Sequence, residues 1–397
     1  MARGIESPTK QGAVMARPRL SANRLARLLM SGAGARSCPG WASLALTCVL
    51  LAPSCEHQME PTGDVLDVPD ALAAMTRFAA LCAGRADIPL ASDSPVLSSV
   101  DRADFSDTEN IIVVDGIENR VFGFDNRGRL TRALGRRGGG PAEYQQLVDA
   151  AMLPGQRIAA LDRSGRIAVF SANGLEASLL PSSRVSGAAC LAGFGNGEVL
   201  LATSALTSAY MVHSINLRTG AVVRSYGSQR GVRAGSPLRV MTGVAVGSDA
   251  QGAHLVTSVT YEARVQIYER SGAEVAEWAL TLPGFVAPTE PGAVLRSRDA
   301  LTRWARSFSH VLLVTLRGPD TLLLSWDRFV EDKRHYFIAA VAVKSGRVLW
   351  SEEVPFRPLR SRGSAVLFLD RRREPSYVGV LCRRFGPRPP NSPPQRR

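Results

Sequence analysis

The chain has 397 residues, 45% of them hydrophobic, and a formal net charge of +13. Residues 1–40 carry +6 and residues 371–397 carry +7, so residues 41–370 are formally neutral. A nucleic-acid-binding face needs its positive charge on the folded body. This distribution argues against a nucleic-acid partner, while the length allows one large core or two smaller ones.

The first predicted element is a signal segment over residues 1–54. Residues 41–53 (WASLALTCVLLAP) form an uncharged apolar run with arginines upstream. The run is shorter than the about 20 residues that cross a bilayer, but it has the length of a signal-peptide hydrophobic region. Because residues 30–54 alone have normal signal proportions, we interpret residues 1–29 as an upstream extension from a misplaced start.

The end of this run, Leu51-Ala52-Pro53-Ser54-Cys55, resembles the lipobox of bacterial lipoproteins, although Ala52 stands where leucine is usual. The resemblance implies cleavage before Cys55 and a lipid on its thiol. We therefore expect an extracytoplasmic protein that meets the membrane through the lipid anchor only. Two alternatives stay open: an ordinary secretory signal, which would give a secreted protein, and a buried apolar segment.

A polar tether is predicted over residues 55–61, followed by a folded domain over residues 62–386 and a disordered Pro/Arg tail over residues 387–397. Residues 70–83 (DALAAMTRFAALCA) have helical propensity and apolar spacing, although a strand is possible. From about residue 100, short β-branched runs alternate with Gly, Asp, Asn and Ser turns, which predicts strands joined by tight hairpins.

A short pattern recurs along this domain at a nearly fixed interval. RVFGFDNRG ending at Gly128 returns as RIAVFSANG ending at Gly174, more faintly at Gly220, and as RVQIYERSG ending at Gly272. The glycines are 46, 46 and 52 residues apart. Repeats of roughly 40–50 residues built from short strands are typical of a β-propeller. Each glycine is expected to close a hairpin by adopting a positive φ.

A fifth hairpin of this type ends at Gly346, and residues 364–370 and 376–382 suggest a sixth set of strands. No hairpin follows the sixth set, so its missing outer strands are expected from residues 61–100. The fold class is therefore all-β: a six-bladed β-propeller of four-stranded antiparallel blades, closed by strands from both termini. The 74 residues from Gly272 to Gly346 imply an insertion, placed at residues 284–309 with a short helix.

After the first hairpin comes LGRRGGGPAEY, residues 134–144. Together with the blades at 113–128 and 160–174, this stretch resembles a group of bacterial six-bladed propellers related to NHL-repeat proteins. The resemblance covers roughly residues 95–280, and Ala142 replaces a usual glycine. Many members are exported and some are lipoproteins, and most have no assigned activity.

Four residues are candidates for ligand binding. Arg136 and Arg137 lie in the glycine-rich stretch, where guanidinium and backbone N–H groups suit an anion, although an inter-blade turn is the favoured interpretation. Asp115 and Asp162 occupy matching strand ends, where lactonase-type propellers place calcium ligands. Later blades lack such carboxylates, so turn capping is favoured for both aspartates.

The histidines and cysteines form no recognisable catalytic set. His57 lies in the tether, and His213, His254, His310 and His335 do not recur at equivalent blade positions, so neither zinc nor calcium is predicted as a cofactor. The sequence cannot assign pairing among Cys82, Cys190 and Cys382, and three scattered buried thiols are favoured.

We therefore expect a monomeric binding or scaffold module that presents inter-blade loops to a protein, peptide or glycan, and not an enzyme. The alternative is a metal-assisted hydrolase or lyase with its site at the channel mouth.

Overall fold

The computed structural model describes residues 68–90, 97–106, 110–180, 188–195, 197–203, 210–228, 244–249, 252–289, 297–370 and 377–386. All of them belong to the compact unit Cys48–Arg397. The predicted signal segment (1–54), tether (55–61) and tail (387–397) lie outside the described residues. The elements run from Val68 to Phe385, and the predicted domain bounds, 62–386, stay a prediction.

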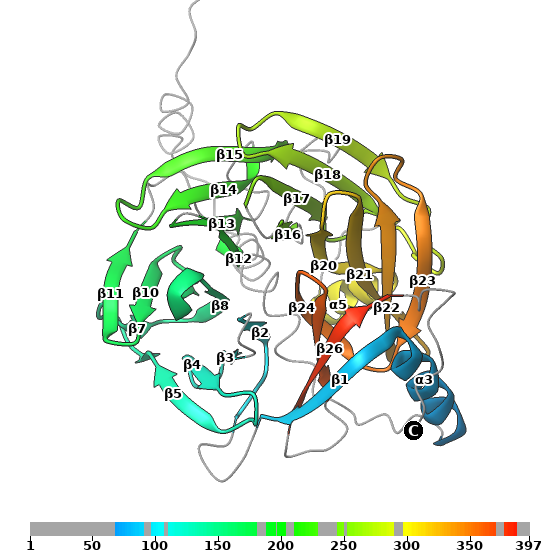
Figure 1. The fold of residues 1–397 in the computed structure, drawn as a ribbon, viewed down its shortest axis with the longest axis horizontal. Helices are drawn as coiled ribbons and strands as arrows, with labels where there is room; N and C mark the ends of the chain where they lie inside the picture. Colours follow the sequence, from blue (N-terminus) through cyan, green and yellow to red (C-terminus); the bar gives the residue numbers. More distant parts are fainter. Residues whose placement is uncertain are drawn as a thin grey trace, which may run out of the picture. The chain divides into compact units, whose positions relative to one another are not determined.

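The chain folds into six four-stranded antiparallel sheets, which confirms the predicted six-bladed propeller (Figure 1). Blades 1 to 3 consist of these strands: β2 (Arg102–Phe105), β3 (Ile111–Asp115), β4 (Arg120–Phe124) and β5 (Leu130–Leu134); β8 (Leu147–Met152), β9 (Ile158–Asp162), β10 (Ile167–Ser171) and β11 (Gly174–Leu179); β12 (Ala188–Phe194), β13 (Glu198–Thr203), β14 (Tyr210–Asn216) and β15 (Val222–Ser228).

Blades 4 to 6 follow in chain order, and blade 6 takes its fourth strand from the beginning of the chain. They consist of these strands: β16 (Val244–Ser248), β17 (His254–Val259), β18 (Arg264–Glu269) and β19 (Glu274–Ala279); β20 (His310–Arg317), β21 (Thr321–Val330), β22 (Lys333–Ala342) and β23 (Val348–Val354); β24 (Arg357–Arg362), β25 (Ala365–Asp370), β26 (Val378–Phe385) and β1 (Cys82–Pro89).

The first strands of the six blades form the inner wall of the ring. β2, β8, β12, β16, β20 and β24 each contact the first strand of both neighbouring blades, and Figure 1 shows them nearest the middle. The fourth strands form the rim. Because successive strands are antiparallel, the inter-blade connections and the second-to-third hairpins share one side of the ring, here termed the loop face. The third-to-fourth hairpins lie on the opposite side, the hairpin face.

The recurring glycines of the sequence lie in these third-to-fourth hairpins. Gly128, Gly174, Gly220, Gly272 and Gly346 have φ between +65° and +109°, a region that residues with a Cβ rarely adopt. In blade 1 the hairpin also passes close to the end of β1, because a Cβ on Gly128 would lie 1.8 Å from the Pro89 carbonyl oxygen. The repeat is therefore a turn requirement that occurs once in each of blades 1 to 5.

The N-terminal strand β1 closes blade 6, as predicted, although residues 61–100 supply one strand of that blade and not several. It pairs antiparallel with β26, from Cys82 opposite Phe385 to Pro89 opposite Val378. Helix α3 (Val68–Leu81) precedes β1, so the predicted helix over residues 70–83 is confirmed, with its last two residues in the strand. Phe78 of α3 is fully buried and makes edge-on contacts with Phe356 and Phe368, both 5.0 Å away between ring centres.

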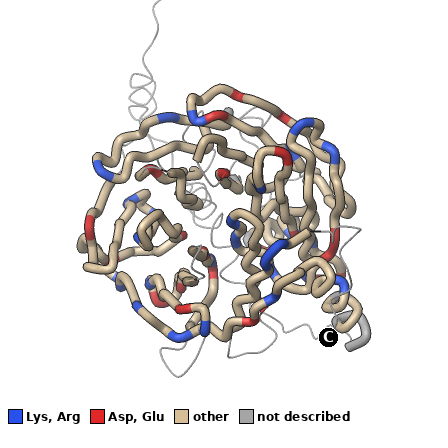
Figure 2. Tube along the Cα trace, viewed as in Figure 1, with Lys and Arg blue, Asp and Glu red and all other residues tan. Residues whose placement is uncertain are grey.

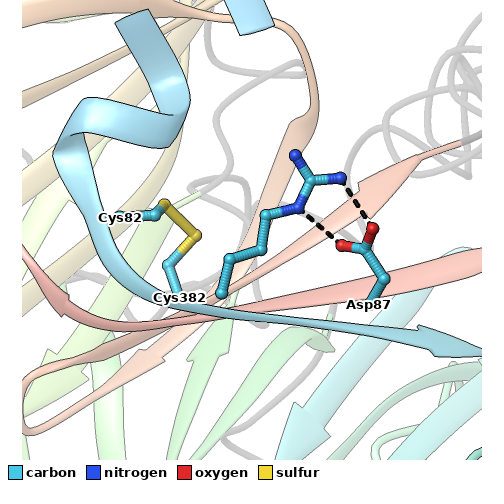
Figure 3. Close-up of a disulfide and its surroundings, with 4 residues drawn as sticks. Cys82, Asp87 and Cys382 are labelled. Atoms are coloured by element: carbon cyan, nitrogen blue, oxygen red, sulfur yellow. Dashed lines mark hydrogen bonds and ion pairs between the residues drawn. A yellow bond between two sulfur atoms is a disulfide. The ribbon is translucent and has the colours of Figure 1, made fainter. Parts of the chain in front are cut away.

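The prediction of three scattered thiols is wrong, because Cys82 and Cys382 form a disulfide (Figure 3). The two cysteines are 300 residues apart in sequence, but the pairing of β1 with β26 brings their Cα atoms to 5.0 Å. Next to this bond, both guanidinium nitrogens Nε and Nη2 of Arg85 bind the carboxylate of Asp87, at 2.6 and 2.8 Å. Closure of the ring is thus covalent as well as hydrogen-bonded.

The predicted insertion in blade 5 contains the predicted helix. Helix α5 (Arg298–Arg306) begins after Ser297, whose Oγ accepts the backbone N–H of Ala300. Neither helix in the described part of the chain is long and apolar enough to span a lipid bilayer.

Replacement of both disulfide cysteines by serine is expected to destabilise the protein. A bond that closes a loop of this length restricts the unfolded chain, and its loss typically costs about 2–5 kcal/mol. A reductant should lower the Tm of the wild type and leave that of the Cys82→Ser/Cys382→Ser variant unchanged. Thermal unfolding followed by circular dichroism measures both, and a wild-type Tm that ignores the reductant would contradict the assignment.

Candidate functional site

The two candidate aspartates lie on the loop face, where each accepts backbone N–H groups. Asp115 accepts those of Ser98, Ile117 and Glu118 at 2.6 to 3.0 Å. Asp162 accepts those of Gln145 and Ser164 at 2.8 and 2.7 Å. Both carboxylates are buried and connect a second-strand turn to the preceding inter-blade loop. These contacts match the turn-capping interpretation, and a ligand-binding role for either residue stays a prediction.

The glycine-rich stretch connects blade 1 to blade 2 on the same face. Within it β6 (Arg136–Arg137) and β7 (Glu143–Tyr144) form a short parallel pair. The Arg136 guanidinium binds the carboxylate of Glu143 at 2.6 Å, and Glu143 also accepts the Gly140 N–H. Arg166 reaches into the loop and donates to the carbonyls of Gly139, Gly140 and Glu143.

An open hollow of about 480 Å³ borders this loop, lined by Gly135, Arg136, Gly140, Pro141, Ala142, Glu143 and Leu175. Arg136 faces it already paired with Glu143, and Arg137 is exposed. An anion would therefore have to compete with Glu143 for Arg136. Anion binding by Arg136 and Arg137 stays a prediction.

A charged cluster on the inner wall, which we term the axial cluster, was missed by the sequence analysis. It consists of Asp104 on β2, Asp149 on β8, and Arg360 and Arg362 on β24. Arg360 lies 3.7 Å from Asp104 and 3.6 Å from Asp149, and Arg362 lies 3.6 Å from Asp104. Both aspartates are buried, and the Arg360 side chain is only 15% exposed.

The axial cluster also satisfies backbone groups of the inner strands, which have no neighbouring strand on their inner side. The N–H of Met152 donates to Asp104 and its carbonyl accepts from Arg362, at 2.8 and 3.2 Å. In the same way the N–H of Leu191 donates to Asp149 and its carbonyl accepts from Arg360, at 2.8 and 3.1 Å. Arg360 thus links the inner strands of blades 6, 1, 2 and 3.

Burial and charge shift the pKa values within this cluster. Burial raises the pKa of Asp149, although Arg360 and Arg102 oppose the shift. For Arg360, burial disfavours the charged form, but Asp104 and Asp149 outweigh it and raise its pKa. Burial, assisted by Asp149, raises the pKa of the neighbouring Cys190 thiol to about 12. The arginine therefore stays charged while the thiol stays protonated and poorly nucleophilic at neutral pH.

The four histidines of the described residues are dispersed among blades 3, 4 and 5. Each Nδ1 contacts a side chain: Ser225 for His213, Asp249 for His254, Asp327 for His310 and Glu353 for His335. His213 is buried, which lowers its pKa. Among the residues that the structure describes, no three His, Cys, Asp or Glu side chains converge as a metal site would require.

Acidic and basic residues are interspersed around the ring (Figure 2), in keeping with the neutral formal charge of residues 41–370. The blades that could be described thus present no continuous stripe of positive charge in this view.

A family model and one solved structure support the same fold. Residues 87–186 match the family model DUF5128, described as a 6-bladed beta-propeller. A member of the DUF4221 family from Bacteroides vulgatus superposes with a TM-score of 0.54 at 10% identity, covering 76% of this chain and 96% of that one. A candidate exported protein from Bacteroides fragilis gives a TM-score of 0.49 at 11% identity, covering 75% and 94%. No curated protein matches the chain in sequence.

Removal of the central arginine is expected to destabilise the ring. Arg360→Met would leave Asp104 and Asp149 buried with a weakened counter-charge, and breaking a buried ion pair typically costs about 3–5 kcal/mol. Arg362→Met is the matched control on the same strand. Its side chain is 30% exposed and pairs with Asp104 alone, so about 1 kcal/mol is expected. Guanidinium chloride unfolding measures both, and equal losses would contradict the central role of Arg360.

Proposed function

We propose that this protein is an exported, lipid-anchored binding module whose loop face recognises a protein, peptide or glycan. The observation that carries the export part is the Cys82–Cys382 disulfide. Structural disulfides persist in oxidising compartments and are rare in the cytosol. The bond agrees with the signal-like run at residues 41–53 and with the lipobox-like sequence that ends at Cys55.

The axial cluster supports the choice of the loop face as the binding surface. Arg360 and Arg362 point from β24 toward the inner strands of blades 1 to 3, and their charges are matched by Asp104 and Asp149. Side chains that already satisfy one another have little to offer a ligand. The loops that differ between blades, by contrast, lie on the loop face, where recognition residues are usually carried by a rigid scaffold.

Lipid attachment is tested at Cys55. Metabolic labelling with a palmitate analogue should label the wild-type protein in its native host, and Cys55→Ser should lose the label and leave the membrane fraction. Cys190→Ser provides a control that changes a thiol elsewhere. Label that persists in Cys55→Ser would overturn the anchor.

Recognition by the loop face is tested with a photo-crosslinking residue placed on either side of one blade. Ile117, in the β3–β4 hairpin on the loop face, is 59% exposed. Arg127, in the β4–β5 hairpin on the hairpin face, is also exposed. Illumination of cells should give a discrete adduct from position 117 and none from position 127. Adducts from position 127 alone would place the binding surface on the hairpin face and contradict the proposal.

The alternative, a metal-assisted hydrolase or lyase, predicts a different result. Purified protein would then contain stoichiometric calcium or zinc that a chelator removes, and metal analysis detects it directly. Such a metal would overturn the pure scaffold function.

A further inference from the structure

His310 differs from the other histidines in how firmly its ring is held. Of the four histidines in the described ranges, three place Nδ1 about 3 Å from a carboxylate. Among these three carboxylates only Asp327, the partner of His310, is fully buried, with 1% of its side chain exposed. The partners of His254 and His335 are 13% and 42% exposed. A buried carboxylate fixes an imidazole more strongly than a solvated one, because water competes less for the bond.

Asp327 is in turn held by Arg334, whose Nε lies 3.1 Å from its second oxygen. The Arg334 guanidinium stacks on Phe329 at 4.9 Å, and the Phe308 ring packs on the imidazole of His310 at 4.9 Å. Each member of the His310–Asp327–Arg334 row therefore has a second contact that limits its rotation.

Blade 5 uses this aspartate differently from blades 1 and 2. Asp327 lies opposite His310, the first residue of the inner strand, just as Asp162 lies opposite Leu147. In blades 1 and 2 the corresponding carboxylates accept backbone N–H groups. In blade 5 the carboxylate of Asp327 binds the imidazole of His310 instead, so the residue that caps a turn in blades 1 and 2 forms an Asp–His pair here.

The second ring nitrogen of His310 is available at the loop face. The His310 side chain is 19% exposed, and Nε2 forms no hydrogen bond within the described residues and is not buried. Because the Asp327 carboxylate can only accept, Nδ1 carries the hydrogen of the neutral ring, which leaves the lone pair of Nε2 as a proton acceptor.

Within the described part of the chain, the serine that precedes His310 in sequence is not placed to act as a nucleophile. Ser309 is fully buried, and its Oγ accepts the backbone N–H of Val286. We therefore take water as the nucleophile.

We propose that His310 is a catalytic general base for the hydrolysis of a carboxylic ester, with Asp327 as its positioning residue. Nε2 takes a proton from water while the water oxygen bonds to the ester carbonyl carbon. The bond from that carbon to the alcohol oxygen then breaks, and the proton passes from Nε2 to the departing alkoxide. The products are a carboxylic acid and an alcohol, and the imidazole is neutral again. This inference is independent of the proposed binding function.

The test uses p-nitrophenyl acetate as the probe. His310→Asn keeps an N–H that can reach Asp327 but cannot accept a proton, and it should release p-nitrophenolate at least about tenfold more slowly than the wild type. His335→Asn, which alters the exposed pair with Glu353, should retain the wild-type rate. A wild-type rate no higher than that of His310→Asn, or an equal loss in His335→Asn, would overturn the proposal.

Two further measurements separate chemistry from folding. Asp327→Asn should lower kcat with little change in KM, whereas a merely structural change would alter the folded fraction, which thermal unfolding reports. If His310→Asn fails to fold, carbethoxylation of the wild-type protein decides. Mass spectrometry should then find His310 modified at a rate close to that of His335. If His335 is modified in the native protein while His310 is protected, Nε2 of His310 is not accessible and the proposal is wrong.

Discussion

Blade 6 takes three strands from the end of the chain and one from the beginning, so the ring is held closed by hydrogen bonds between β1 and β26. An open ring would expose strand edges and lose the contacts between neighbouring inner strands. The Cys82–Cys382 disulfide lies within this pair, and Phe78 of α3 covers the aromatic core of the same blade. Closure leaves no terminal blade, so each inner strand contacts the inner strands of two neighbouring blades.

The same blade also stabilises the centre of the ring. β24 carries Arg360 and Arg362, which reach the carboxylates of β2 and β8 and the carbonyls of β8 and β12. A closing blade with uncharged residues at these positions would leave Asp104 and Asp149 buried with a weakened counter-charge. Rim and centre are thus both fixed by blade 6, one by main-chain pairing and a covalent bond, the other by charge.

Local turn chemistry made the fold predictable, because a glycine with positive φ must recur wherever the third strand turns into the fourth. The missing sixth hairpin likewise indicated closure by the N-terminus. The disulfide could not be predicted, since Cys82 and Cys382 become neighbours only when the ring closes. The axial cluster was equally hidden, although two arginines at alternate positions, 360 and 362, in a strand of the inner wall were a usable signal. The histidines were set aside because they do not recur at equivalent blade positions. The pairing of His310 with Asp327 depends on the register between β20 and β21, which the sequence pattern of one blade does not give.

The position of β1 also has a consequence for how the chain matures. β1 is synthesised early, but its partner β26 emerges about 300 residues later, so the sheet that completes the ring cannot assemble until residues 378–385 have been made. Contacts of such long sequence separation form slowly. Until then the first blades have free edges that are prone to mispairing with other chains. The native Cys82–Cys382 disulfide can therefore form only after β26 has paired with β1. It marks the molecules in which the ring has closed.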